Sequence, residues 1–166
     1  QHWAPYTVPI YCILEGLCLG AISFVFESLY DGIVLQAISL TVCILFSLLF
    51  AYRAKIIKAT ENFKLGVFAA TCGIALLYII DLVMRFFGTG ISLIDVDNTS
   101  ISSILFSLFV VIIASLNLVI DFDFIEEGSE KGAPKYMEWY GAFGLLVTLI
   151  WLYLELLRMI AKIRGR

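Results

Sequence analysis

The sequence has few charged residues, since Asp, Glu, Lys and Arg make up only 15% of its 166 residues. Soluble domains carry about a quarter. The chain also lacks a basic face, and its formal net charge is −3, which excludes a nucleic-acid partner. The single histidine, His2, stands at the chain end, so histidine-based catalysis inside a membrane is excluded as well. Hydrophobic residues make up 61% of the chain, and only a lipid bilayer offers a place for so much apolar surface.

Patterns typical of metal binding and of catalysis are also missing. Asp95 and Asp97 alternate as calcium ligands do, but no glycine or distal glutamate completes a calcium loop. No nucleophile–base pair occurs. We therefore expect no enzymatic activity, no bound metal and no cofactor. The cysteines lie inside apolar runs without metal-ligand spacing, and we interpret them as reduced core thiols: Cys12, Cys18, Cys43 and Cys72.

Several apolar runs are long enough to cross a bilayer, which takes about 20 helical residues at a rise of about 1.5 Å each. We predict a single all-α integral membrane domain, a bundle of transmembrane helices whose environment is the lipid bilayer. The oligomeric state stays open. The predicted spans cover residues 6–26, 32–52, 66–87, 101–124 and 136–160.

Some of these spans contain acids. An ionisable side chain at hydrocarbon depth is costly, so each such residue is a candidate functional site with an expected partner. Glu155 lies in the last span, Glu15 lies near the middle of the first, and Asp121 lies toward the inner end of the fourth, followed by Asp123. The alternative interpretation is a protonated acid that hydrogen-bonds to a neighbouring helix and has only a structural role.

Spacing and depth indicate partners for these acids. Asp81 and Arg85 stand four residues apart on one helix, which predicts an ion pair. Counting helical rise places Asp81 and Glu155 at the same depth, so Arg85 could serve either acid, and the two acids form one candidate pair. Asp121 could pair instead with Glu15 or Asp123.

The first span carries small residues at helical spacing beside Glu15: Gly16, Gly20 and Ser23. Small residues allow membrane helices to approach closely. We therefore expect this face, with Glu15 beside it, to point into the bundle.

Basic residues indicate the orientation. The 53–64 loop carries four of them, and short loops rich in Lys and Arg stay cytoplasmic. Alternation then places 88–100 outside and 126–135 inside. The C-terminal tail falls outside despite its own basic residues, which conflicts with the same rule. Either the fifth segment is re-entrant or bundle packing overrides the tail, and we favour five full spans.

Four stretches carry a family resemblance. They are LNLVIDFDFIE (116–126), GAPKYMEWYGAFG (132–144), WLYLELLR (151–158) and YCILEGLCLG (11–20). Together they resemble the Bax-inhibitor family, most closely its bacterial YccA-type branch. The resemblance implies seven helices with the last one central, and a place in the bacterial inner membrane. Two N-terminal helices would then be missing, and since the sequence begins with Gln1 we expect it to be a fragment.

The resemblance also implies an activity, a pH-sensitive calcium leak gated by two aspartates that share a proton, one on the sixth helix and one on the seventh. Asp121 matches the first. Thr148 stands at the position of the second, and Glu155 follows seven residues later on the same helix face. The second acid is therefore either displaced to Glu155 or absent.

Two function classes remain open. In the first, calcium is the transported ion. Neighbouring carboxyl groups in a low dielectric cannot both ionise, so they titrate as a unit, and their deprotonation would push helices apart and attract a divalent cation. In the second, which the YccA resemblance implies, the chain is an interaction protein that modulates a membrane-bound quality-control protease. The acidic 126–135 connection would then be its docking surface.

Overall fold

The computed structural model describes residues 3–166, so His2 lies outside the described residues. Each predicted span is a helix, and the described part of the chain contains no strand. The prediction of an all-α membrane bundle is confirmed. The helices are α1 (Ala4–Leu29), α2 (Ile33–Arg53), α3 (Glu61–Phe86), α4 (Ile101–Glu130) and α5 (Tyr136–Arg164).

The largest extensions beyond the predicted spans are in α3, α4 and α5, where helical structure continues through polar residues after the apolar run stops. α3 begins at Glu61 because the Thr60 side chain accepts a hydrogen bond from the Phe63 N–H at 3.3 Å and caps the helix. α4 continues to Glu130, and the chain turns only at Gly132, whose φ of 62° suits glycine. α5 runs without interruption to Arg164, so it is not re-entrant.

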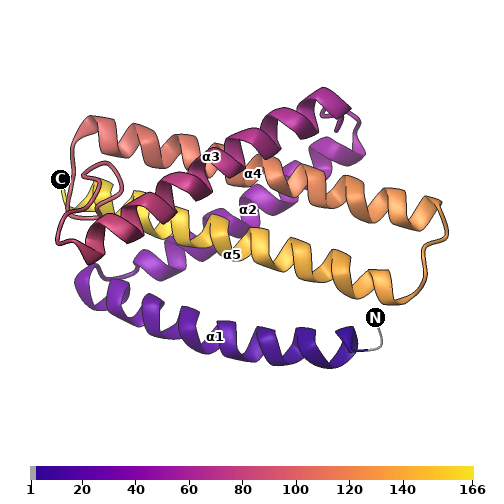
Figure 1. The fold of residues 1–166 in the computed structure, drawn as a ribbon, viewed down its shortest axis with the longest axis horizontal. Coiled ribbons are helices and arrows are strands. Elements are labelled where there is room, and N and C mark those ends of the chain that lie inside the picture. Colours follow the sequence, from indigo (N-terminus) through magenta and orange to yellow (C-terminus); the bar gives the residue numbers. More distant parts are fainter. Residues whose placement is uncertain (1–2) are drawn as a thin grey trace.

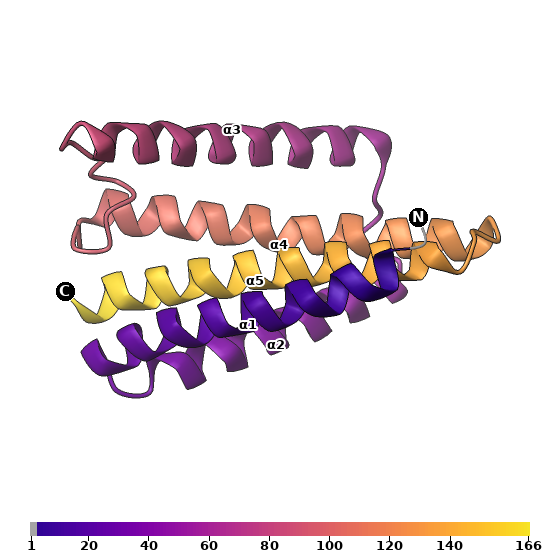
Figure 2. The same cartoon turned by 60° about the horizontal axis from the view of Figure 1, so that its bottom comes forward.

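The last helix occupies the centre of the bundle. α5 packs against α1, α2 and α4, and its most extensive contact is with the antiparallel α4 (Figures 1 and 2). α3 packs on the other side of α4 and lies apart from α1 and α2 (Figure 2). The C-terminus lies at the same end as the α1–α2 turn and the α3–α4 loop, while the N-terminus lies at the opposite end.

The surface of the bundle is apolar along its length. Phe24, Leu35 and Phe68 are each about two-thirds exposed or more, and many other large hydrophobic side chains also face outward. A contiguous apolar surface of this kind marks a membrane-facing protein. The buried core is small and lies mainly where α2, α4 and α5 meet, around Leu118 and Leu152.

α4 and α5 pack closely at Gly141. A Cβ built on Gly141 would lie 2.9 Å from Cγ1 of Ile125. Leucine at this position must therefore separate the two helices, and overpacking costs about 1–3 kcal/mol. We expect Gly141→Leu to lower the unfolding temperature in detergent. Gly16→Leu is the matched control, because nothing lies within 4 Å of a Cβ at Gly16, and an equal loss in both variants would contradict the helix contact.

The predicted small-residue face of α1 is only partly packed. Gly16 and Gly20 are exposed, with no described atom within 4 Å of an added Cβ, so the expectation of a close helix contact there is wrong. Ser23 does reach the core helix, since its hydroxyl lies 2.7 Å from the hydroxyl of Tyr153 on α5. The physical reason is that α1 contacts α5 through larger or polar side chains, Tyr11 and Ser23, and not through the glycines.

Candidate functional site

Asp121 lies on the face of α4 that meets α5. A Cβ on Gly144 of α5 would lie 3.6 Å from Oδ1 of Asp121, and the Thr148 side chain interacts with the same carboxyl group. The Thr148 hydroxyl also donates to the Gly144 carbonyl at 3.1 Å. Oδ2 of Asp121 is buried and has no hydrogen-bond partner among the described residues. A buried polar atom without a partner is costly, which makes this position a functional candidate.

Asp123 does not pair with Asp121. Its carboxylate lies 2.6 Å from Nζ of Lys64 on α3 and accepts a hydrogen bond from the Tyr52 hydroxyl of α2 at 3.2 Å. Two residues along a helix differ by about 200° in direction, so the two aspartates point to different neighbours. The proposed Asp121–Asp123 pair is therefore wrong.

Glu15 is also separate from Asp121. Its described interaction is with Tyr11, one turn earlier on α1, and the Tyr11 ring packs edge-on against Phe143 of α5. No hydrogen bond in residues 3–166 joins Glu15 to Asp121, so the geometry does not support that pair. The reason is the rotation of α1 about its axis, which directs the Glu15 side chain toward Tyr11 of the same helix.

Glu155 is buried on α5, with 3% of its side chain exposed. Its Oε1 accepts a hydrogen bond from the Tyr78 hydroxyl of α3 at 2.5 Å and another from Arg158 Nη1 at 3.1 Å. The Arg158 guanidinium also lies 5.4 Å from the centre of the Tyr78 ring. The partners of Glu155 are therefore a tyrosine and its own helix neighbour, and the proposed Glu155–Asp81 and Glu155–Arg85 pairs are wrong.

Asp81 and Arg85 form the ion pair that their spacing predicts, with Nε 2.8 Å from Oδ2. The pair also organises the α3–α4 loop. Arg85 Nη2 lies 2.8 Å from Asp95 Oδ1, and the Ile91 N–H donates to Asp81 Oδ1 at 2.7 Å. These contacts hold the α3–α4 loop against the end of α3. Because Arg85 is bound to Asp81 and Asp95, it does not reach Glu155.

Lys162 is a buried residue that the sequence did not predict, because it lies among the basic residues near the C-terminus. Its side chain is 1% exposed, and Nζ donates to the Leu93 carbonyl and to the Ser107 hydroxyl, both at 3.0 Å. Ser103 donates to the same Leu93 carbonyl at 2.9 Å. A signal was present, since Lys162 follows Glu155 by two helical turns and therefore shares its buried face.

The candidate acids differ in their neighbours, and Glu15, which interacts with Tyr11 of its own helix, lies apart from the α4–α5 contact. Asp81, Asp123 and Glu155 each lie beside a cation. Asp121 has no cationic partner among the described residues, and it faces a glycine and a threonine of the central helix. No group of three or more His, Cys, Asp or Glu side chains in the described chain is arranged to hold a metal ion. The site is therefore a single unneutralised carboxyl group at the α4–α5 contact.

Five long apolar helices, the last of which is central, with ionisable groups inside the bundle, define a multi-pass integral membrane protein. The family model described as Bax inhibitor 1 like matches residues 1–165. The chain belongs to this Bax inhibitor 1 like family. No curated protein and no solved structure matches it.

Proposed function

We propose that the chain is a pH-sensitive cation leak, with calcium as the transported ion, and that Asp121 is its proton-sensing group. The supporting observation is the buried Oδ2 of Asp121, which has no described partner at the contact between α4 and the central helix. In the family resemblance, this position belongs to the first of the two gating aspartates. The proposal includes no enzymatic activity and no resident cofactor.

The mechanism follows from the cost of a buried charge. A neutral Asp121 fits the packed α4–α5 contact beside Gly144. An ionised Asp121 would place a negative charge there without a neighbouring cation, which is unfavourable unless water or a cation enters. Opening of the α4–α5 contact would admit water and cations, and the carboxylate would then attract a divalent cation. Flux should therefore rise as pH rises through the range in which Asp121 loses its proton.

This is a one-carboxylate version of the gate. Thr148 stands where the family resemblance places the second aspartate, and a hydroxyl supplies no second charge. Glu155 does not replace that aspartate, because Arg158 and Tyr78 already occupy its Oε1. We therefore expect a simpler titration than that of a coupled acid pair, with a single proton step.

Calcium flux into proteoliposomes tests Asp121. The native protein should show calcium flux that increases with pH. In Asp121→Asn, the flux at every pH should equal that of the native protein at acidic pH, because the amide cannot ionise. The matched control is Asp97→Asn, which removes an exposed carboxylate from the α3–α4 loop. An Asp121→Asn variant that keeps the native pH response would remove this residue from the mechanism.

The proposed orientation keeps the 53–64 loop in the cytoplasm. Three of the basic residues near the C-terminus bind other protein groups: Arg158 binds Glu155, Lys162 binds the Leu93 carbonyl, and Arg164 binds the Asp31 carbonyl at 2.6 Å. Basic side chains that are bound by other protein groups influence the membrane orientation less than unbound basic side chains in a loop do. This supports an outward C-terminus despite the positive-inside rule.

The second candidate is modulation of a membrane-bound quality-control protease, and it is favoured by exposure of the acidic end of α4. Glu126, Glu127 and Glu130 are all exposed, and Glu127 pairs with Lys131. These carboxylates could dock a basic surface of a partner. Retention of a protease in a pull-down, together with no calcium flux at any pH, would favour this candidate over the leak.

A further inference from the structure

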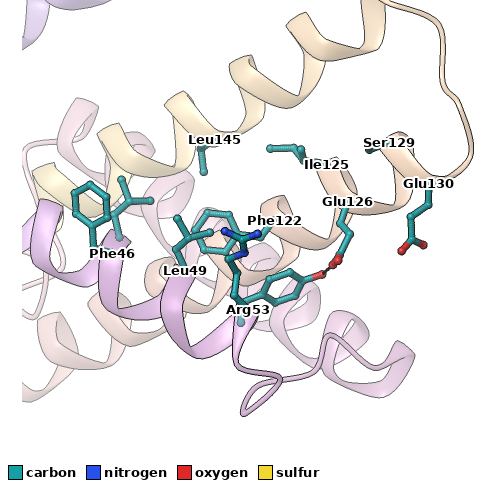
Figure 3. Close-up of a pocket in the computed structure, with 11 residues that line it drawn as sticks. Phe46, Leu49, Arg53, Phe122, Ile125, Glu126, Ser129, Glu130 and Leu145 are labelled. Atoms are coloured by element: carbon teal, nitrogen blue, oxygen red, sulfur yellow. Dashed lines mark hydrogen bonds between the residues drawn. The ribbon is translucent and has the colours of Figure 1, made fainter.

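A groove of about 660 Å³ opens between α2, α4 and α5 at the end of the bundle that carries the 53–64 loop (Figure 3). Its volume lies in the range of roughly 300–1,000 Å³ that is typical of ligand sites. The deeper lining is apolar and the outer lining is polar. The lining residues are Leu45, Phe46, Leu49, Tyr52, Arg53, Phe122, Ile125, Glu126, Ser129, Glu130 and Leu145.

The change from apolar to polar follows the helix axes. α2 and α4 run in the same direction, so Leu45 and Phe122 lie deep while Arg53 and Glu130 lie at the rim. Leu45 and Arg53 are eight residues apart on α2, and so are Phe122 and Glu130 on α4. Eight helical residues correspond to a rise of about 12 Å. This gradient matches a phospholipid, whose acyl chains lie in the hydrocarbon and whose headgroup lies at the interface.

The rim carries both signs of charge. Arg53 makes no ion pair within residues 3–166, and in Figure 3 its guanidinium lies among the groove-lining side chains. Glu130 likewise has no ion pair among the described residues, and Glu126 accepts a hydrogen bond from Tyr52. A guanidinium binds phosphate in a bidentate manner, whereas carboxylates bind an ammonium group.

We propose that this groove is a specific site for a zwitterionic phospholipid with a primary ammonium group, that is, phosphatidylethanolamine. Arg53 binds the lipid phosphate, Glu126 and Glu130 accept hydrogen bonds from the ammonium, and the apolar lining holds an acyl chain. The two glutamates disfavour a phosphatidylglycerol headgroup, because it carries a negative charge and no cation. They also discriminate against phosphatidylcholine, whose quaternary ammonium has no N–H to donate.

Native mass spectrometry of the delipidated chain with the three lipids tests this site. We expect phosphatidylethanolamine to bind about tenfold more tightly than either other lipid, a factor that corresponds to about 1.4 kcal/mol. Arg53→Gln should weaken binding of phosphatidylethanolamine by a similar factor. Glu126→Gln with Glu130→Gln should remove its advantage over phosphatidylcholine. These substitutions are at exposed positions, so the fold should tolerate them.

Two further variants make the test specific. Leu145→Trp should fill the groove and displace the lipid while every rim charge stays in place. Lys58→Gln, which removes an exposed cation from the neighbouring loop and not from the groove, should bind like the native chain. Equal affinity for all three lipids, a preference for phosphatidylglycerol, or an equal loss with Lys58→Gln would overturn the proposal.

Discussion

Lys162→Ala should lower the free energy of unfolding by about 3 kcal/mol and loosen the 87–100 loop. The side chain is almost fully buried, so its loss leaves a cavity. It also removes the two hydrogen bonds from Nζ that join α5 to the Leu93 carbonyl and to Ser107 on α4. Thermal or denaturant unfolding in detergent measures the stability, and hydrogen exchange of the loop amides measures its release.

A second variant separates packing from hydrogen bonding. Lys162→Met restores most of the volume without a donor, so it should recover part of the stability while loop exchange stays fast. Arg166→Ala is the control, because it removes an exposed terminal cation. A Lys162→Ala protein with native stability and native loop protection would show that this lysine does not hold the loop.

Glu155→Gln should lower the free energy of unfolding by about 2 kcal/mol. Removing one partner of a fully buried ion pair costs about 3–5 kcal/mol, but Arg158 is partly exposed and water screens its charge. The amide still accepts a hydrogen bond from Tyr78, so the loss arises mainly from the unneutralised guanidinium. Unfolding in detergent measures this difference.

The double variant Glu155→Gln with Arg158→Gln isolates the pair. Removing both charges should restore part of the stability, because no unpaired cation then remains at this level of the bundle. If the two losses simply add, the groups do not interact and the assignment of Arg158 as the partner of Glu155 is wrong.

Features that depend on one helix could be predicted from the sequence. The length and apolarity of each run predict the five helices, and the four-residue spacing predicts the Asp81–Arg85 pair. The Thr60 cap follows from its position before a helical run. Burial of Glu155 follows from its place within a long apolar span. In each case the neighbours along the chain are also the neighbours in space.

Features that depend on how helices rotate against each other could not be predicted. Tyr78 and Lys64 reach acids on other helices, and nothing in the spacing of the sequence specifies that register. The pairing of Asp121 with Glu15 fails for the same reason, because depth along the bilayer normal gives no direction around a helix. Burial of Lys162 likewise depends on the α3–α4 loop, whose Leu93 carbonyl accepts a hydrogen bond from its Nζ, and no spacing along the chain predicts that contact.

In the proposed mechanism, proton loss from Asp121 opens the cation path. Infrared difference spectra of reconstituted protein, recorded with calcium flux across a pH series, test it most directly. We expect a carboxylic-acid C=O band that disappears in step with rising flux, is missing in Asp121→Asn, and persists in Glu15→Gln. A flux curve that rises while this band stays unchanged, or that is identical in Asp121→Asn, would contradict the gating role of Asp121.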